Sequence, residues 1–297
     1  MVRPADAAPA SPAGQRLRDL VPGEPPLVVP GCHDGLSAVL VEAAGFPAAY
    51  LTGFGLSASL LGAPDVGLLT QTEMAAACQR VCAATSLPVI ADADTGYGGP
   101  LDVARTVDLY ERAGVAALQI EDQVAPKRCG HLAGKEVVPL DEAVTRIRSA
   151  VRARSVPSTI VIARTDAVAT DGLEVAVERA LRFADAGADW LFVEAVTTVE
   201  DLAVVGRRLA GVPLVLNWVD GGRTPTLDLA TVAALGFAVV IAPVAGVLAA
   251  AGAVRDRLAQ LREGLGESPA AMGFDELQRL VGLPERLAWA DAAESGT

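Results

Sequence analysis

The chain has 297 residues, enough for two average domains or for one α/β barrel. Hydrophobic residues make up 52% of it and charged residues 20%, a composition that supports a large buried core and excludes a disordered chain. The formal charge of -12, with no run of more than two basic residues, would repel phosphate backbones and anionic lipids, so nucleic acid is not an expected partner.

Short apolar runs recur along the chain, each too short for a helix, apolar throughout as in a strand covered on both faces, and ended by polar or glycine residues. Helical stretches such as LDVARTVDLYERAG lie between them and stop at a glycine. Eight strand–helix units predict a closed (β/α)8 barrel, the TIM barrel of the α/β class. The predicted strands are, in order, LVVPGCHD, AAYLTG, PVIADAD, AALQIED, TIVIARTD, WLFVEA, PLVLNW and FAVVIAP.

The barrel pattern divides the chain into three parts. Residues 1–22 are rich in Ala, Pro and Gly and are expected to be partly mobile, residues 23–264 form the barrel, and residues 265–297 form a helical extension whose apolar faces need a partner surface. The uncharged stretch from Leu229 to Val254 is long enough to cross a bilayer, but Pro243 interrupts it. We interpret it as a helix end, the eighth strand and the start of the eighth helix, and expect no membrane span.

The four cysteines show no CxxC spacing, and the opening residues MVRPADAAPASPAGQ lack the apolar core of a signal peptide. We therefore expect a reduced, cytoplasmic protein. Cys78 and Cys82 would share one helix face, where packing by small apolar side chains is favoured over a metal site.

Polar residues follow most of the predicted strands, at the end of a barrel where active sites lie. The carboxylates after the third and fourth strands, Asp92, Asp94 and Glu121, are hard oxygen donors that suit Mg2+ or Mn2+ better than zinc. The alternative for Asp92 and Asp94 is a turn or helix-cap role. Arg164, after the fifth strand, suits a substrate carboxylate or phosphate, or else a structural pair with Glu121.

The segment KRCGHLAGK, residues 127–135, places a cysteine among cationic side chains and glycines. Such a loop can move, close over an anionic ligand and lower the pKa of the Cys129 thiol. We interpret Cys129 as a proton donor or acceptor, against the alternative of a buried, inert cysteine.

Several motifs together resemble the isocitrate lyase and phosphoenolpyruvate mutase superfamily, in order and spacing from about Pro30 to Pro243. They are YLTGFG, PDVGLLT, DADTGYGG, IEDQVAPKRCGHLAGK, IARTDA and LFVEA. The chain looks most like the short lyases that cleave methylisocitrate or dimethylmalate. Trp218 and Asp220 stand where methylisocitrate lyases carry other residues, which predicts an altered substrate pocket with the metal and loop machinery retained.

The resemblance implies a Mg2+-dependent barrel whose eighth helix is exchanged with a neighbour in a homodimer or homotetramer. Asp92 and Asp94 would hold the metal, directly or through water, with Glu121 in support.

The resemblance also implies a binding site for a small carboxylate substrate. Thr52, Gly53 and Arg164 would grip its 2-oxo acid portion, with Gly130 and Asn217 as further substrate-binding residues.

The catalytic group implied by the resemblance centres on the gating loop. Lys127, Cys129 and His131 belong to this loop, with Cys129 protonating the carbanion released when the carbon–carbon bond breaks. Glu194, in the pocket, is a further catalytic candidate. Tyr50 falls near the reacting hydroxyl.

The leading hypothesis is a lyase that cleaves a 2-hydroxy di- or tricarboxylate to pyruvate or a related 2-oxo acid plus a second carboxylate. Such a reaction needs a base for the hydroxyl proton, a cation for the developing negative charge and an acid for the departing enolate. The alternatives are a phosphonomutase of the carboxyphosphonoenolpyruvate type and a barrel that binds a carboxylate metabolite without catalysis.

Overall fold

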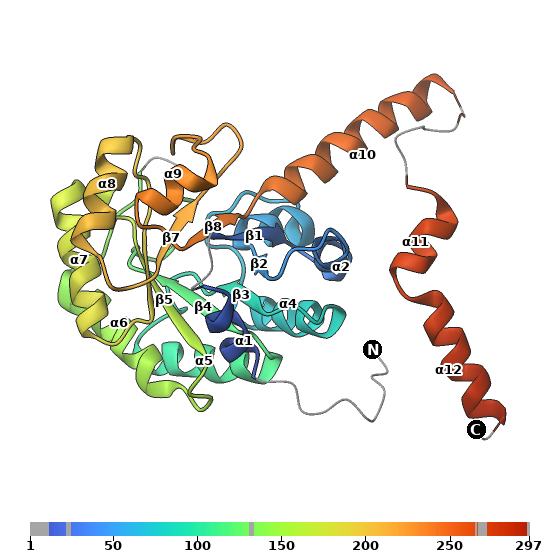
Figure 1. Cartoon of the computed structure of the whole chain (residues 1–297), viewed down its shortest axis with the longest axis horizontal. Helices are drawn as coiled ribbons and strands as arrows, with labels where there is room; N and C mark the ends of the chain where they lie inside the picture. Colours follow the sequence, from blue (N-terminus) through green and yellow to red (C-terminus); the bar gives the residue numbers. More distant parts are fainter. Residues whose placement is uncertain (1–11, 22–24, 131–133, 265, 267–271, 296–297) are drawn as a thin grey trace.

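The computed structural model describes residues 12–21, 25–130, 134–264, 266 and 272–295. Eight parallel strands close into a barrel in the order β1 to β8 (Figure 1), which confirms the predicted (β/α)8 fold. The strands are β1 Leu27–Cys32, β2 Ala49–Leu51, β3 Val89–Asp92, β4 Ala117–Glu121, β5 Ile160–Thr165, β6 Trp190–Val193, β7 Leu214–Asn217 and β8 Val239–Ala242.

Helices follow the strands and surround the barrel. After β2 the chain forms a short α3 (Gly53–Leu56) and a π-helical turn, η1 (Ser57–Leu61), before the longer covering helix begins. The other helical elements of the barrel are α2 Gly35–Ala43, α4 Gln71–Ala84, α5 Pro100–Ala113, α6 Leu140–Ala153, η2 Ala167–Ala169, α7 Leu173–Asp185, α8 Val199–Arg208 and α9 Leu229–Ala234.

The alternation of side chains along each strand decides what reaches the barrel mouth. Ile90, Ile162 and Phe192 belong to the buried cluster inside the barrel, whereas their neighbours in the sequence pack against the surrounding helices. Because the side-chain period of a strand is two, the next inward positions are Asp92 on β3 and Arg164 on β5. The strands that build the core therefore also aim two charged side chains into the mouth.

A helix that the sequence did not predict packs on the barrel at its N-terminal side. Helix α1 (Ala13–Leu20) buries Leu17 completely within the interior cluster, and Arg18 pairs with Asp189 at 2.7 Å. It lies within the segment expected to be partly mobile, of which residues 1–11 and 22 are outside the described part of the chain. The predicted domain boundaries stay predictions.

The uncharged stretch folds as predicted into the end of α9, strand β8 and the start of α10 (Ala245–Glu263). Within the described ranges, no helix has the length and apolar character needed to span a membrane.

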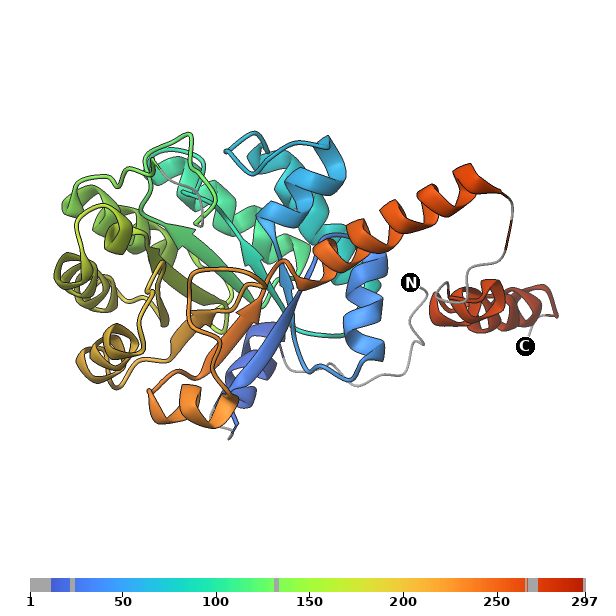
Figure 2. The same cartoon turned by 90° about the horizontal axis from the view of Figure 1, so that it is seen from above.

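The last three helices leave the barrel. Helix α10 runs outward in both views, and α11 (Phe274–Leu280) and α12 (Leu283–Ser295) lie beyond it (Figures 1 and 2). None of their described residues is buried, although large apolar side chains are present, such as Phe274 at 76% exposure. The helix that follows β8 thus does not cover its own barrel in the way that α4 to α8 do.

No disulfide links Cys32, Cys78, Cys82 or Cys129. Burial raises the pKa of Cys32 and of Cys82 to about 12, and raises the pKa of Cys78 well above its usual range. These thiols stay protonated at neutral pH, which agrees with a packing role.

Candidate active site

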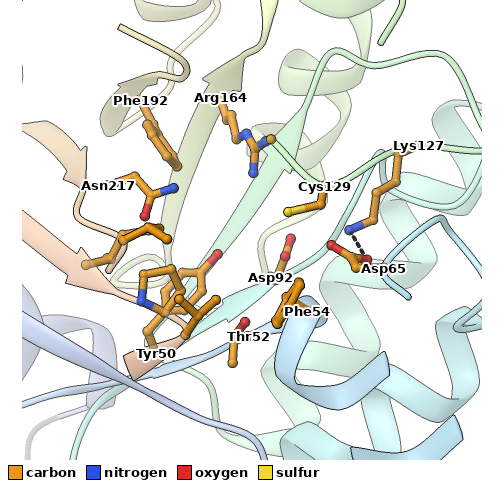
Figure 3. A pocket seen from close by; sticks show the side chains of 15 residues that line it. Tyr50, Thr52, Phe54, Asp65, Asp92, Lys127, Cys129, Arg164, Phe192 and Asn217 are labelled. Carbon is orange, nitrogen blue, oxygen red and sulfur yellow. Dashed lines mark ion pairs between the residues drawn. The ribbon is translucent and has the colours of Figure 1, made fainter. Parts of the chain in front are cut away.

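A pocket opens at the carboxyl ends of the strands and collects side chains from nearly the whole ring (Figure 3). Of the predicted site residues, those lining the pocket are Tyr50, Thr52, Asp92, Lys127, Cys129, Gly130, Arg164 and Asn217. Gly53, Asp94, Glu121 and Glu194 contact members of this set, as described below. His131 lies outside the described residues.

Asp92 and Asp94 are both buried at the end of β3. The Asp94 amide donates to Oδ1 of Asp92 at 3.1 Å, and Asp94 has a φ of 45°, a left-handed conformation that is uncommon for residues other than glycine. A Cβ at Gly53 would lie 2.9 Å from Oδ2 of Asp92. The backbone at Gly53 therefore packs closely against this carboxylate, and a side chain at position 53 would collide with it.

Lys127 is buried between two carboxylates, with its Nζ 2.7 Å from Oδ1 of Asp65 and 2.8 Å from Oδ1 of Asp94. Burial disfavours its charge, but the surrounding carboxylates, Asp94 foremost, outweigh that effect and raise the pKa of Lys127 well above its usual range. Lys127 is therefore a fixed cation. Asp65 was not named as a site residue by the sequence reasoning, although it lies in the PDVGLLT motif that contributed to the family resemblance.

Arg164 is held by the protein on several sides. Its Nε and Nη2 donate to the two oxygens of Asp166, each at 2.9 Å, and its Nη1 lies 3.3 Å from Oε2 of Glu121. The guanidinium also lies over the Phe192 ring, 5.3 Å from the centroid. The structural pairing considered as an alternative is thus present, and it fixes Arg164 at the pocket wall, where a substrate role stays a prediction.

The gating-loop segment is anchored on both sides of Cys129. Lys127 holds the first side, while Lys135 donates to Oδ1 of Asp166 at 2.8 Å and to the carbonyl of Gly130 at 2.6 Å on the other. Both loop lysines are paired with buried carboxylates of the protein, and closure of the loop over an anionic ligand stays a prediction. Cys129 is partly exposed and lines the pocket.

Gly130 packs closely against the side chains of Arg164 and Glu194. A Cβ at this glycine would be 2.7 Å from Nη2 of Arg164 and 2.7 Å from Oε1 of Glu194, so a side chain here would collide with both. Asn217, at the end of β7, donates from Nδ2 toward the Glu194 oxygens at 3.3 and 3.4 Å. These contacts place Glu194 immediately behind the pocket wall.

Tyr50 lies on β2 with its ring in the interior cluster. Burial, followed by the negative charge of Asp92, raises the pKa of its phenol well above the usual range. The hydroxyl therefore stays protonated and can donate a hydrogen bond to a ligand oxygen.

The site holds three more buried carboxylates than buried cations. Burial raises the pKa of Asp94 to about 6 and raises that of Glu121 well above its usual range, in both cases against the opposing effect of a nearby cation. The carboxylates are Asp65, Asp92, Asp94, Glu121, Asp166 and Glu194, and the cations are Lys127, Lys135 and Arg164.

This charge excess and the hard oxygen donors fit a divalent cation. Over the described ranges, no three acidic, His or Cys side chains are grouped closely enough to enclose a metal by themselves. Mg2+ commonly keeps several waters and takes only one or two protein carboxylates. Asp92 and Asp94 meet that requirement, because both are buried at the end of β3 and Asp92 lines the pocket.

Comparisons with known proteins agree with this arrangement. The profile of the phosphoenolpyruvate phosphomutase family matches residues 17–262. The chain belongs to this family. The 2,3-dimethylmalate lyase of Eubacterium barkeri is 43% identical over 271 residues, which cover 90% of the chain and 93% of the relative.

Two solved structures extend the comparison. A crystal structure of a 2,3-dimethylmalate lyase, from the PEP mutase/isocitrate lyase superfamily, has a TM-score of 0.90 and 44% identity, with 96% of each chain covered. Phosphonopyruvate hydrolase in complex with oxalate and Mg2+ has a TM-score of 0.85 and 32% identity, covering 95% of this chain and 99% of that one. The predicted superfamily and the prediction of an enzyme are confirmed, and the chain is an enzyme of a family that includes carbon–carbon lyases.

Asp166 is the carboxylate on which two cations of the site depend, and the Asp166→Asn variant tests this. Arg164 and Lys135 would both lose a buried ionic partner, so we expect the free energy of unfolding in urea to fall by about 3–5 kcal/mol. The matched control is Glu174→Gln, which breaks the exposed pair with Arg208. We expect this variant to change the free energy of unfolding by less than about 1 kcal/mol. Equal stability of Asp166→Asn and the unmodified chain would contradict this assignment.

Proposed function

We propose that the chain is a Mg2+-dependent carbon–carbon lyase that cleaves a 2-hydroxy di- or tricarboxylate to a 2-oxo acid, such as pyruvate, plus a second carboxylate. One observation carries the proposal: Arg164, Cys129 and a cluster with more buried carboxylates than cations meet at one pocket in the barrel mouth. The similarity to 2,3-dimethylmalate lyase over most of the chain supports it.

Asp92 and Asp94 are the proposed metal-holding residues, with Glu121 in support. A bound Mg2+ would orient the hydroxyl and carboxylate oxygens of the substrate and stabilise the negative charge that develops as the bond breaks. The crystal structure of phosphonopyruvate hydrolase with oxalate and Mg2+ supports this cofactor.

Thr52, Gly53 and Arg164 are proposed to bind the portion of the substrate that becomes the 2-oxo acid. Arg164 supplies a cation whose position is fixed by Asp166 and Glu121, so little conformational entropy is lost when a carboxylate binds. Gly130 lets the loop backbone approach this ligand without a side chain in the way.

The proposed bond cleavage moves two protons. The 2-hydroxyl loses its proton to a base, for which the Glu194 carboxylate is the candidate, because the Tyr50 phenol keeps its proton and serves as a hydrogen-bond donor. The carbon–carbon bond then breaks, its electron pair forms the enolate of the departing carboxylate, and the Cys129 thiol protonates the carbon. Lys127 holds this segment of the loop in place, and His131 completes the predicted loop set.

A second candidate function is carbon–phosphorus chemistry of the phosphonomutase type. The relationship to phosphonopyruvate hydrolase favours it, because that structure covers 95% of this chain at 32% identity. Phosphorus NMR distinguishes the two, since only this second function changes the phosphorus environment of a phosphonate substrate.

The lyase proposal is tested with a panel of 2-hydroxy di- and tricarboxylates that includes dimethylmalate and methylisocitrate. We expect 2-oxo acid to appear with Mg2+, to disappear with EDTA and to return when excess Mg2+ is added, because the developing charge needs the cation. The readout is 2-oxo acid formation, measured by hydrazone absorbance. Formation that persists unchanged in EDTA would refute metal dependence, and no formation from any substrate would refute the lyase.

The role of Cys129 is tested with Cys129→Ser. A hydroxyl is a far weaker acid than a thiol, so kcat is expected to fall at least about 100-fold if the thiol protonates the carbanion. The control is Cys82→Ser, at a partly buried cysteine away from the pocket. A Cys129→Ser protein that cleaves at a near-normal rate would remove Cys129 from the mechanism.

We also propose that the chain assembles as a homo-oligomer through its last three helices. Helices α10 to α12 bury none of their described residues on their own barrel, yet they carry Leu258, Phe274, Leu287 and Trp289 at more than half exposure. A second copy with the same uncovered apolar surfaces is the proposed occupant, as in a closed symmetric assembly.

The assembly proposal predicts a mass by light scattering of two or four times the 30.4 kDa chain. Replacing both Phe274 and Trp289 by serine should lower that mass, because the interface loses its two largest apolar side chains. Leu101→Ser, at a leucine on α5 that is 86% exposed, should leave the mass unchanged. A monomeric full-length chain would contradict the proposal.

A further inference from the structure

The lining of the pocket divides into two halves along the barrel. The carboxylates and cations come from the segments that begin at β2 to β5, and Figure 3 shows Asp65, Asp92, Lys127 and Cys129 together on one side, with Phe192 and Asn217 opposite them. Apart from Asn217, the segments from β6 to β8 contribute hydrocarbon, while Phe54 after β2 is an apolar lining residue on the charged side. The apolar lining residues from β6 to β8, which we call the hydrocarbon wall, are Phe192, Val219, Ile241, Pro243 and Val244.

The strand order places the two halves of the lining on opposite sides of the barrel. In the closed barrel β6, β7 and β8 are consecutive neighbours, so side chains at their carboxyl ends form one continuous surface. Asn217, at the end of β7, is the polar lining residue contributed by these three strands. It directs its amide nitrogen toward the Glu194 carboxylate.

Among the described residues that line the pocket, Arg164 is the one cation in contact with the hydrocarbon wall, where it lies over the Phe192 ring. The cations of the pocket are Lys127, which pairs with Asp65 and Asp94, and Arg164, which stands at the border between the two halves. The Arg164 guanidinium lies over the Phe192 ring, and its nitrogens are directed to the carboxylates of Asp166 and Glu121. A carboxylate placed against the wall would lose water without gaining an ionic partner, whereas an alkyl group there would be buried against hydrocarbon.

We propose that the hydrocarbon wall binds an alkyl branch of the substrate, so that the site selects alkyl-substituted 2-hydroxy dicarboxylates over substrates that carry a third carboxylate. This inference deepens the proposed lyase function and rests on it for the identity of the reaction. The selection itself is a property of binding and can be measured without turnover.

The first test compares two compounds with six carbons each that lack the hydroxyl and so cannot be cleaved, 2,3-dimethylsuccinate and tricarballylate. Calorimetry is done on the full chain with Mg2+ present. We expect dimethylsuccinate to bind at least about tenfold more tightly, because a carboxymethyl arm would leave a buried carboxylate unpaired. Equal affinity, tighter binding of tricarballylate, or failure to bind dimethylsuccinate would overturn the inference.

The second test places a cation on the wall. In Val219→Arg, at a half-buried position that tolerates a longer side chain, we expect tricarballylate to gain about tenfold in affinity and dimethylsuccinate to lose affinity. The matched control is Val175→Arg, at an exposed valine on α7, which should change neither. If Val219→Arg does not fold, Val219→Lys takes its place. A folded variant that keeps the preference for dimethylsuccinate over tricarballylate would contradict the role of the wall.

Kinetics with dimethylmalate and methylisocitrate separate this inference from the proposed function. Efficient cleavage of methylisocitrate with no advantage for dimethylmalate would refute the selection and leave the lyase in place. Cleavage of neither compound, together with tighter binding of dimethylsuccinate, would refute the lyase for these substrates and support the wall.

Discussion

The buried ammonium of Lys127 is the contact on which the geometry of the site depends. By pairing with Asp65 and Asp94 it joins three segments that are distant in sequence: the connection before α4, the turn after β3 and the loop that carries Cys129. A buried charge that loses its partner is strongly destabilising, so each of these segments is held by the other two. The position of Cys129 over the pocket is a consequence of this arrangement.

The same charges explain how Cys129 and Gly130, on a glycine-containing loop, can have defined positions. Lys127 and Lys135 flank Cys129 and Gly130, and both are directed inward to carboxylates, so opening this part of the loop would break buried ion pairs on two sides. Of the other carboxylates, Asp92 lines the pocket and Glu121 pairs with Arg164 at 3.3 Å. A divalent cation together with a dicarboxylate brings no net charge, so both can enter without disturbing the pairs that hold the loop.

The repeating features of the fold could be predicted from the sequence, whereas contacts made by irregular segments could not. The strands could be found because apolar runs recur at regular intervals, and their period of two also placed Asp92 and Arg164 at the mouth. Asp65 lies on an irregular connection after η1, where no periodicity indicates direction. The pair between Lys135 and Asp166 joins residues 31 apart and depends on how β5 meets the loop in space. Phe192 and Val244 resemble ordinary core residues until the closed barrel places them beside a pocket.

The division of the pocket separates chemistry from selectivity. Residues from β2 to β5 form one coupled ionic network, in which a change at any member alters the charge balance of the others. Val219, Ile241 and Val244 take no part in that network, so substitutions there can reshape the pocket while Lys127, Arg164 and Asp166 keep their partners. A fold built in this way can hold its metal and loop constant while its substrate varies, since function resides in the site rather than in the fold. The resemblance of one barrel to both a dimethylmalate lyase and a phosphonopyruvate hydrolase is what such a division would produce.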